Sequence, residues 1–326
     1  MKLDNKYSAR QQNLKSILYL LDEYDELSAK QLAALTGLSI VSINKLLDVI
    51  SSNSEIIATD FLNTRGRRAK IYKLNYDVLQ LGIIQLVETD NKIKATYFLT
   101  NLAGKIIYKE FNDQEITSVT QLIDFIKQAI AEHGSPQKII IGVPGAELDG
   151  YLQISDIKSL QGINLSLAIK KAVNIETIIV NDANAGTFGA AIELNESENI
   201  AVGIYFPNNF GPGVGIVINN RLINGADGLA GEIEYSTVDT NDNVCQQIMQ
   251  HIQNIISFLD PNLLIVYAAK LSLTDLQIEQ IKQHVQNNLP LHNKYQLDFN
   301  RDFEKDYLIG LTTIGRKNIL EHLIAN

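Results

Sequence analysis

From residue 81 onward, short apolar segments rich in β-branched residues alternate with stretches of helical periodicity. Residues 116–133 have the spacing of an amphipathic helix. The segments typical of strands cover residues 81–86, 93–99, 139–143, 177–180 and 200–206. This alternation predicts an α/β fold with largely buried, partly parallel sheets. Because ligands bind at the carboxyl ends of strands in open α/β sheets, the residues that follow these strands are candidate site residues.

Two segments after predicted strands carry polar side chains suited to a site. The apolar run 178–180 ends in Asn181 and Asp182, a carboxamide and a carboxylate that can hold sugar hydroxyls or, in an enzyme, take a proton. Asp182 is equally typical of a residue that caps the next helix. The glycine-rich segment 225–232 ends in Glu232, and its glycines permit close backbone approach. Taken alone, that segment is also typical of an ordinary loop.

The N-terminal residues have the pattern of three short helices. The first buries one face, a capping box at Ser28 and Gln31 starts the second, and Gly37 ends it. Ser39 can cap the third helix. The apolar positions of the first and third helices are Leu14, Ile17, Leu18, Leu21, Ile43, Leu46, Leu47 and Ile50. The side chains expected to point away from this core are Ser39, Ser42, Asn44 and Lys45. The pattern predicts a helix-turn-helix that presents these residues to a DNA major groove, with a solvated three-helix bundle as the alternative.

A basic hairpin is predicted directly after these helices. Residues 56–58 and 71–74 have strand patterns, and the turn between them carries Arg65, Arg67 and Arg68. Guanidinium groups at a hairpin tip suit contacts to phosphates or to a narrow minor groove. A basic tip alone is usually a solvated loop. Placed after a recognition-type helix, it predicts a winged helix-turn-helix that binds double-stranded DNA.

Charge is divided unevenly along the 326 residues, whose net charge is −9. Residues 1–76 hold 11 Lys and Arg against 8 Asp and Glu, whereas residues 77–326 hold 17 against 29. A basic end can therefore contact phosphates while an acidic body stands away from them. No apolar run approaches the roughly 20 residues of a bilayer span, and the first residues do not begin a signal peptide. With Cys245 as its one cysteine, the chain is expected to be cytoplasmic, without disulfides or membrane association.

Several motifs occur in an order that resembles the ROK family of repressors, unannotated reading frames and sugar kinases. Following the predicted winged helix, they are Gly142-Val143-Pro144-Gly145, Asn181-Asp182-Ala183-Asn184-Ala185, Gly225-Ala226-Asp227-Gly228-Leu229-Ala230-Gly231-Glu232-Ile233 and Leu259-Asp260-Pro261. The resemblance covers essentially the whole chain. It implies an actin-like ATPase fold of two lobes around a cleft. The fused winged helix is similar to that of the family's xylose and N-acetylglucosamine repressors.

The chain departs from this family where its kinases bind nucleotide. Those kinases carry an Asp-x-Gly-Gly-Thr loop around the phosphates and magnesium, and the equivalent stretch here is residues 82–89. Bulky Gln85 and Leu86 provide no glycine-lined nest of N–H groups, and Glu88 would repel phosphate. The second phosphate segment, residues 211–215, keeps its glycines without a threonine. The resemblance gives Asp182 the place of the catalytic base, yet these departures predict neither kinase activity nor a nucleotide cofactor.

The zinc site of the family is also incomplete. Tyr235 stands at the position of its histidine, and Cys245 falls where the first of three cysteines would be. One thiolate cannot build a tetrahedral structural site, so no metal is predicted. His251, close by, is expected to lie on the surface of a helix over residues 248–259.

The resemblance implies a sugar pocket that has been altered. Asn181, Asp182 and Glu232 remain as hydroxyl partners, and Tyr235 offers a phenol whose ring can stack on a pyranose. A glutamate that follows the last family cysteine has no visible counterpart. The expected effector is a sugar or sugar derivative, with loss of effector binding as the alternative.

These observations predict a DNA-binding transcriptional regulator, a repressor of carbohydrate genes. The expected domains are a winged helix over 1–76, a first lobe over 77–185 with residues 311–326 packed back on it, and a shortened second lobe over 186–310. A homodimer, with tetramers as a further assembly, would bind a pseudo-palindromic operator. The alternatives are a residual ATP-dependent sugar kinase and a DNA binder with no sugar effector.

Overall fold

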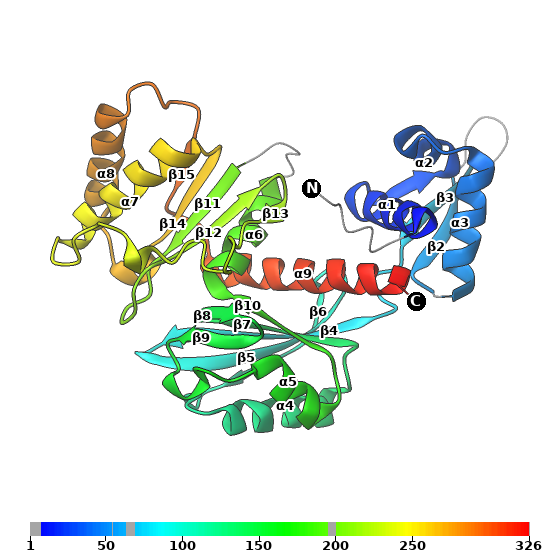
Figure 1. Ribbon diagram of the computed structural model, residues 1–326, viewed down its shortest axis with the longest axis horizontal. Coiled ribbons are helices and arrows are strands. Elements are labelled where there is room, and N and C mark those ends of the chain that lie inside the picture. The colour runs from blue at the N-terminus through cyan, green and yellow to red at the C-terminus, as the bar shows by residue number, and fades with distance from the viewer. Residues whose placement is uncertain (1–7, 54, 63–68, 195–199, 326) are drawn as a thin grey trace.

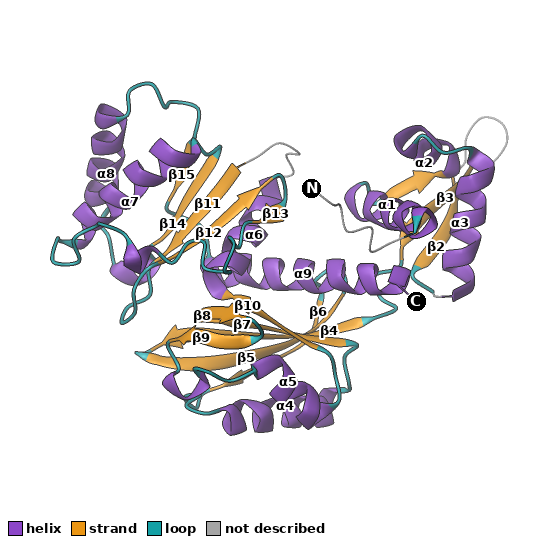
Figure 2. Cartoon of the chain, in the orientation of Figure 1, coloured by secondary structure: helices purple, strands orange, loops and turns teal. Residues whose placement is uncertain are grey.

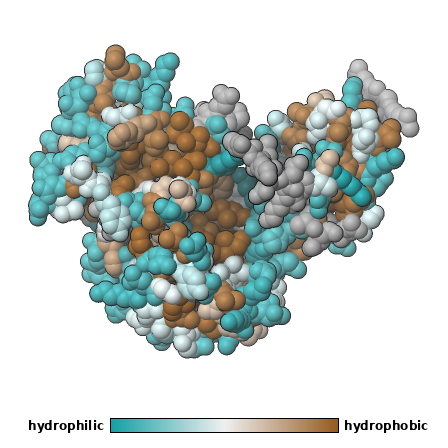
Figure 3. All heavy atoms as spheres, in the orientation of Figure 1, coloured by the Kyte–Doolittle hydropathy of each residue, from teal (hydrophilic) through white to brown (hydrophobic). Residues whose placement is uncertain are grey.

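The computed structural model describes residues 8–53, 55–62, 69–194 and 200–325. Figure 1 shows an N-terminal domain and two larger lobes, with one long helix, α9, running between the lobes toward the N-terminal domain. In each lobe, helices cover a face of a β-sheet (Figure 2). The space-filling view shows that the N-terminal domain stands clear of the second lobe (Figure 3).

The N-terminal domain combines three helices with a small antiparallel sheet of order β1-β3-β2. Helices α2 and α3 meet at 111° across a three-residue turn, which is the geometry of a helix-turn-helix. The predicted apolar faces are buried, and Ile17, Leu32 and Ile43 are fully excluded from solvent. The elements are α1 (Ala9–Glu23), β1 (Glu26–Ser28), α2 (Ala29–Thr36), α3 (Ile40–Asn53), β2 (Ile57–Leu62) and β3 (Ala69–Leu74).

Lobe 1 is built on a mixed five-stranded sheet of order β10-β7-β4-β5-β6. Strands β10, β7 and β4 are parallel neighbours, whereas β4, β5 and β6 are antiparallel. The parallel strands are rich in isoleucine because helices cover both faces (Figure 1). The elements are β4 (Gln80–Thr89), β5 (Lys92–Asn101), β6 (Ile106–Asn112), α4 (Val119–His133), β7 (Lys138–Val143), β8 (Gly145–Leu148), β9 (Tyr151–Ser155), a 3-10 turn (Lys158–Leu160), α5 (Leu165–Val173) and β10 (Thr177–Asn181).

Lobe 2 has a second five-stranded sheet, of order β13-β12-β11-β14-β15. Ile248, Ile252 and Ile256 recur at four-residue spacing and pack α7 against this sheet. The elements are β11 (Ile200–Tyr205), β12 (Gly213–Ile218), β13 (Arg221–Leu222), a 3-10 turn (Ile233–Tyr235), α7 (Val244–Leu259), β14 (Leu263–Tyr267), a 3-10 turn (Ala269–Leu271), α8 (Asp275–Asn288) and β15 (Gln296–Asp298).

Helices α6 (Asp182–Leu194) and α9 (Phe303–Ala325) pack against each other between the lobes. Their backbones touch at two glycines. A Cβ atom on Gly189 would lie 1.9 Å from the carbonyl oxygen of Asp306, and one on Gly310 would lie 1.8 Å from that of Ala185. Glycine at both positions therefore permits a helix contact that no side chain could enter.

The last turns of α9 also contact helix α1 of the N-terminal domain. The guanidinium Nε of Arg316 lies 2.8 Å from a carboxylate oxygen of Asp22 in α1, and both side chains are largely buried. Farther along α9, Glu321 accepts hydrogen bonds from Lys15 at 2.7 Å and from Tyr19 at 2.6 Å. The orientation of the N-terminal domain is thus fixed by the same helix that packs between the lobes.

Most predicted elements are present, but several details differ from the sequence analysis. Helix α4 begins at Val119 rather than 116, because the Ser118 hydroxyl accepts from the Gln121 amide as an N-cap. Helix α9 begins at Phe303 rather than 311, and α6 runs through the predicted boundary at 185.

The prediction of a surface His251 is wrong. It is 5% exposed, because on α7 it lies one turn after buried Ile248 on the side that faces the sheet. Burial lowers the pKa of its imidazole.

No single helix among the described residues is both long and apolar enough to cross a bilayer. Helices α2 and α3 have that length and apolar composition only when they are taken together, as a bent pair.

Candidate functional site

The turn between α2 and α3 is formed as the sequence predicts. Ser28 and Gln31 make the reciprocal capping box of α2, and Gly37 ends that helix with φ 72°, in the left-handed region. The Ser39 hydroxyl accepts from the Ser42 amide at 3.1 Å and lies 3.0 Å from the Ser42 hydroxyl. Both serine hydroxyls therefore take part in the cap of α3.

The four predicted DNA-contacting residues of this segment lie away from the core. Ser39, Asn44 and Lys45 are exposed, and Ser42 is half-buried. Ile43 and Leu47 on the opposite side are buried. Asn44 and Lys45 lie about one turn after the start of α3, and their side chains together form an exposed polar surface on that helix.

The predicted hairpin is present as β2 and β3, in which Ile57 pairs with Leu74 and Leu62 with Ala69. Arg65, Arg67 and Arg68 lie outside the described residues. On β3 the exposed cations are Lys70, whose ammonium is 5.0 Å from the ring centre of Tyr72, and Lys73.

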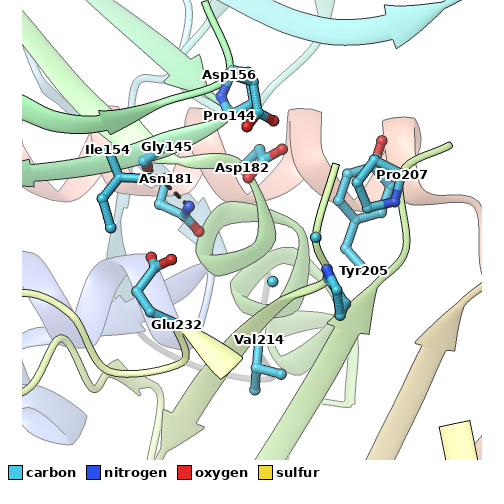
Figure 4. Close-up of a pocket in the computed structure, with 13 residues that line it drawn as sticks. Pro144, Gly145, Ile154, Asp156, Asn181, Asp182, Tyr205, Pro207, Val214 and Glu232 are labelled. Carbon is cyan, nitrogen blue, oxygen red and sulfur yellow. Dashed lines mark hydrogen bonds between the residues drawn. The ribbon is translucent and has the colours of Figure 1, made fainter. Parts of the chain in front are cut away.

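A small polar cavity lies between the lobes, at the carboxyl end of β10 (Figure 4). Its volume is about 60 Å³, which is room for about two water molecules. Its polar lining comes from Asp156, Asn181, Asp182, Tyr205 and Glu232. A second cavity of about 290 Å³ shares Asp156 with it.

The Asn181 side chain positions the backbone around the cavity. Its Nδ2 donates to the carbonyl of Gly145 at 3.0 Å, and its Oδ1 accepts from the amide of Asn184 at 2.8 Å. The first bond ties β10 to the β8–β9 hairpin, and the second satisfies an amide in the first turn of α6.

The cap of α6 is made by the Asn181 side chain, not by Asp182 as the capping alternative would require. Asp182 is the first residue of α6, its Oδ1 accepts from the Ala183 amide at 2.8 Å, and it also lines the cavity. The side chain is 8% exposed. Burial raises the pKa of this carboxyl to about 7, and the nearby charges of Asp156 and Glu232 add to the increase.

The glycine-rich segment brings Glu232 to the cavity, but it does not bring Tyr235. Gly231 has φ 96°, and a Cβ atom there would lie 1.8 Å from the carbonyl oxygen of Val214. This close approach to β12 sets the position of Glu232 beside it. Tyr235 lies outside the cavity lining and is 74% exposed.

Two polar residues of the cavity lining were not predicted from the sequence. Asp156 follows β9, a strand of the β8–β9 hairpin that the sequence analysis did not predict. Tyr205 is the last residue of β11, so the rule that ligands bind at strand carboxyl ends could have identified it. Figure 4 shows Asp156, Asn181, Asp182, Tyr205 and Glu232 converging from different elements of both lobes.

The stretch equivalent to the phosphate loop of the kinases is an uninterrupted hairpin strand, β4. Gln85 is buried, and its Nε2 donates to the carbonyl of Glu304 at 2.9 Å. The carboxylate of Glu88 is also buried and accepts from the Asn208 amide at 2.7 Å and from Asn209 Nδ2 at 2.5 Å. An anionic side chain of lobe 1 is thus hydrogen-bonded to the loop that precedes the second phosphate segment.

One group of potential metal ligands occurs within the described part of the chain. His133 Nε2 lies 3.5 Å from a carboxylate oxygen of Glu132 and 4.0 Å from one of Glu110. Cys245, at the position where the family's zinc site begins, is half-buried and not part of that group.

The chain is similar in sequence to known proteins. The xylose repressor of Caldicellulosiruptor bescii is 26% identical over 256 residues, which are 74% of this chain and 63% of that protein. The chain therefore spans less than two thirds of the length of this relative.

Solved structures share the fold. A ROK family transcriptional regulator, described as a homolog of the E. coli MLC protein, superposes with a TM-score of 0.75 at 16% identity, over 97% of this chain and 98% of that one. A putative N-acetylmannosamine kinase from Listeria monocytogenes superposes with a TM-score of 0.61 at 15% identity, over 72% and 97%. These likenesses confirm the predicted α/β, actin-like fold. The model of the ROK family matches residues 92–247 of this chain.

Proposed function

We propose that this protein is a DNA-binding transcriptional repressor of carbohydrate genes. The observation that carries the proposal is the pair α2 and α3, bent by 111° and followed by a β-hairpin, joined to a domain of the ROK family. The similarity to a xylose repressor supports the same conclusion. Residues 1–76 act as the DNA-binding domain, residues 77–185 with the end of α9 as the first lobe, and residues 186–310 as the second.

The DNA contacts follow from this arrangement. Helix α3 enters a major groove with Ser39, Ser42, Asn44 and Lys45 near base edges and phosphates. Arg65, Arg67 and Arg68 contact the flanking backbone or minor groove. Two copies related by a two-fold axis read a pseudo-palindromic operator, and pairing of such dimers gives tetramers. The apolar surface visible over lobe 2 in Figure 3 supports self-association.

DNA binding is tested with duplexes enriched from a random library by the full-length protein. Replacement of Arg67 and Arg68 by Glu should weaken binding and reduce the slope of affinity against salt concentration, because fewer counterions are released. Exposed Lys127 of α4 serves as the control position, and Lys127→Glu should leave both unchanged. Enrichment of no duplex would exclude the proposed function.

The cavity between the lobes is proposed to bind a sugar or sugar derivative through Asn181, Asp182 and Glu232. Tyr235 stays a prediction from the sequence, and a ligand would have to widen the cavity to reach it. Among the described residues that line the cavity, none is Lys, Arg or His. Uncharged sugars should therefore raise the melting temperature more than their phosphates do. Asp182→Ala should abolish this increase and leave DNA affinity intact.

Phosphoryl transfer is proposed to be lost. The buried Glu88 carboxylate and the side chain of Gln85 lie along the stretch that would have to hold nucleotide phosphates. One observation favours the alternative of a residual sugar kinase: the raised pKa of Asp182, about 7, suits a general base. Incubation with ATP, magnesium and a panel of hexoses separates the two, and formation of sugar phosphate would establish the kinase.

A DNA binder without an effector is the remaining alternative, and the small volume of the cavity favours it. A thermal-shift screen over sugars decides between them, because only a ligand-binding cavity gives stabilisation that depends on sugar concentration.

A further inference from the structure

Two adjacent apolar residues lie in the first turn of α3, the helix proposed to enter the major groove. Val41 is 65% exposed and Ile40 is 48% exposed, whereas Ile43, two positions later, is fully buried. Isolated exposed apolar residues are common on protein surfaces. These two are adjacent, in the first turn of a helix whose exposed face is otherwise polar.

Helical geometry places Val41 at the centre of the exposed face. Asn44, Lys45 and Asp48 follow it at spacings of three, four and seven residues, and all three are exposed. In helix-turn-helix proteins the N-terminal residues of the second helix contact the base edges. Val41 is therefore the first-turn side chain that projects most directly away from the core of this domain.

The neighbouring polar groups do not replace it in that role. The hydroxyl of Ser39 accepts from the Ser42 amide and also contacts the Ser42 hydroxyl, so both are engaged in capping the helix. Farther along the same face, Asp48 would be repelled by phosphates, and this favours an approach of the duplex at the N-terminal end of α3. The first side chain to meet the groove floor there carries two methyl groups.

We propose that Val41, flanked by Ile40, recognises thymine by contact with the 5-methyl group that this base presents in the major groove. An apolar side chain gains from contact with this methyl group, which cytosine lacks, and Lys45 one turn later supplies the positive charge that a duplex requires. The inference rests on the proposed DNA-binding function and adds the base that α3 selects.

The experiment starts from a duplex enriched from a random library by the full-length protein. Each thymine in the enriched sequence is replaced in turn by deoxyuridine, which removes the 5-methyl group and keeps the base pair. At one or more positions the substitution should weaken binding by about fourfold, the factor expected for one buried methyl-sized group. The variant Val41→Ser should bind the thymine duplex more weakly and should lose the difference between the two duplexes at those positions.

Two further variants complete the design. Ile40→Ser should show a smaller loss, because Ile40 lies beside the centre of the face. Leu276→Ser on α8 is the control, since Leu276 is 69% exposed in lobe 2 and should have no effect. Thermal unfolding of each variant verifies that it folds.

The outcomes separate the two proposals. If no duplex is enriched, DNA binding itself fails and the thymine inference fails with it. If a duplex is enriched but deoxyuridine is neutral at every position, DNA binding stands and thymine recognition is overturned. Thymine recognition by Val41 is also overturned if Val41→Ser retains the full sensitivity to deoxyuridine.

Discussion

At the scale of single residues, the buried carboxyl of Asp182 makes stability depend on pH. Burial raises its pKa in the folded protein to about 7, well above the ordinary value of an aspartate. The folded state therefore holds a proton on this group in the pH range where the unfolded chain has released it. Stability from this group is present below pH 4 and is lost as the pH rises toward 7.

The variant Asp182→Asn should remove this pH-dependent penalty. Asparagine retains an oxygen that can accept from the Ala183 amide and carries no charge to desolvate. As the pH rises from 5 to 8, the free energy of unfolding of the variant, taken relative to that of the wild type, should increase by on the order of 2 kcal/mol. Urea unfolding at the two pH values measures the difference. Asp124→Asn, at an exposed position of α4, should show none. An Asp182→Asn profile parallel to that of the wild type would contradict the raised pKa.

At the scale of elements, α9 holds the N-terminal domain through a buried ion pair. Arg316 lies 2.8 Å from Asp22, donates to the carbonyl of Leu102 at 3.0 Å, and lies over the ring of Tyr76. Burial and the charge of Asp22 raise the pKa of Tyr76, whose hydroxyl donates to Asp22 at 3.3 Å, to about 12. Loss of the cation would leave the largely buried carboxylate of Asp22 without its ion-pair partner.

Arg316→Ala should therefore loosen the N-terminal domain from the lobes. The expected cost is about 3 kcal/mol, the usual range for breaking a buried pair on one side. Calorimetry should show the N-terminal domain melting separately, and limited proteolysis should cleave near residues 75–79, between β3 and β4. Arg221→Ala, at an exposed position of β13, is the control. A single transition at the wild-type temperature would show that this ion pair is not required for docking.

The element scale also shows what the sequence could predict. Periodicity and capping signals placed α1, α2, α3, β4, β7 and β10 closely, because each element carries its own local pattern. The residues Asn181, Asp182 and Glu232 were found from strand ends and glycines. Asp156 was missed because its position depends on the β8–β9 hairpin, which the sequence did not predict. Tyr235 does not line the cavity and stays a prediction, because no local signal fixes where a 3-10 turn directs its ring.

At the scale of the whole molecule, Glu88 links the two lobes on the side where related kinases bind nucleotide. Its carboxylate bonds to Asn208 and Asn209 of lobe 2, and Lys270 of lobe 2 donates to its carbonyl at 2.5 Å and to the Tyr205 hydroxyl at 2.9 Å. These contacts tie the two lobes together on this side of the cleft.

Glu88→Ala should allow the lobes to separate. Removing the carboxylate leaves the Asn208 amide without its acceptor and leaves Asn209 Nδ2 with Asn91 alone, which favours hydration of the cleft. Small-angle scattering should show a larger radius of gyration for the variant, and sugar binding should become weaker if closure is part of it. Glu279→Ala, at an exposed position of α8, should scatter as the wild type does. Identical scattering of Glu88→Ala and wild type would mean that other contacts set the width of the cleft.

The contact of α6 with α9 limits how the lobes can move at all. Where Gly189 and Gly310 meet the opposite backbone, there is no layer of side chains along which one helix could slide past the other. We therefore expect any relative movement of the two helices to be a rotation about this crossing point, and such a rotation would shift the end of α9 that contacts the N-terminal helix α1.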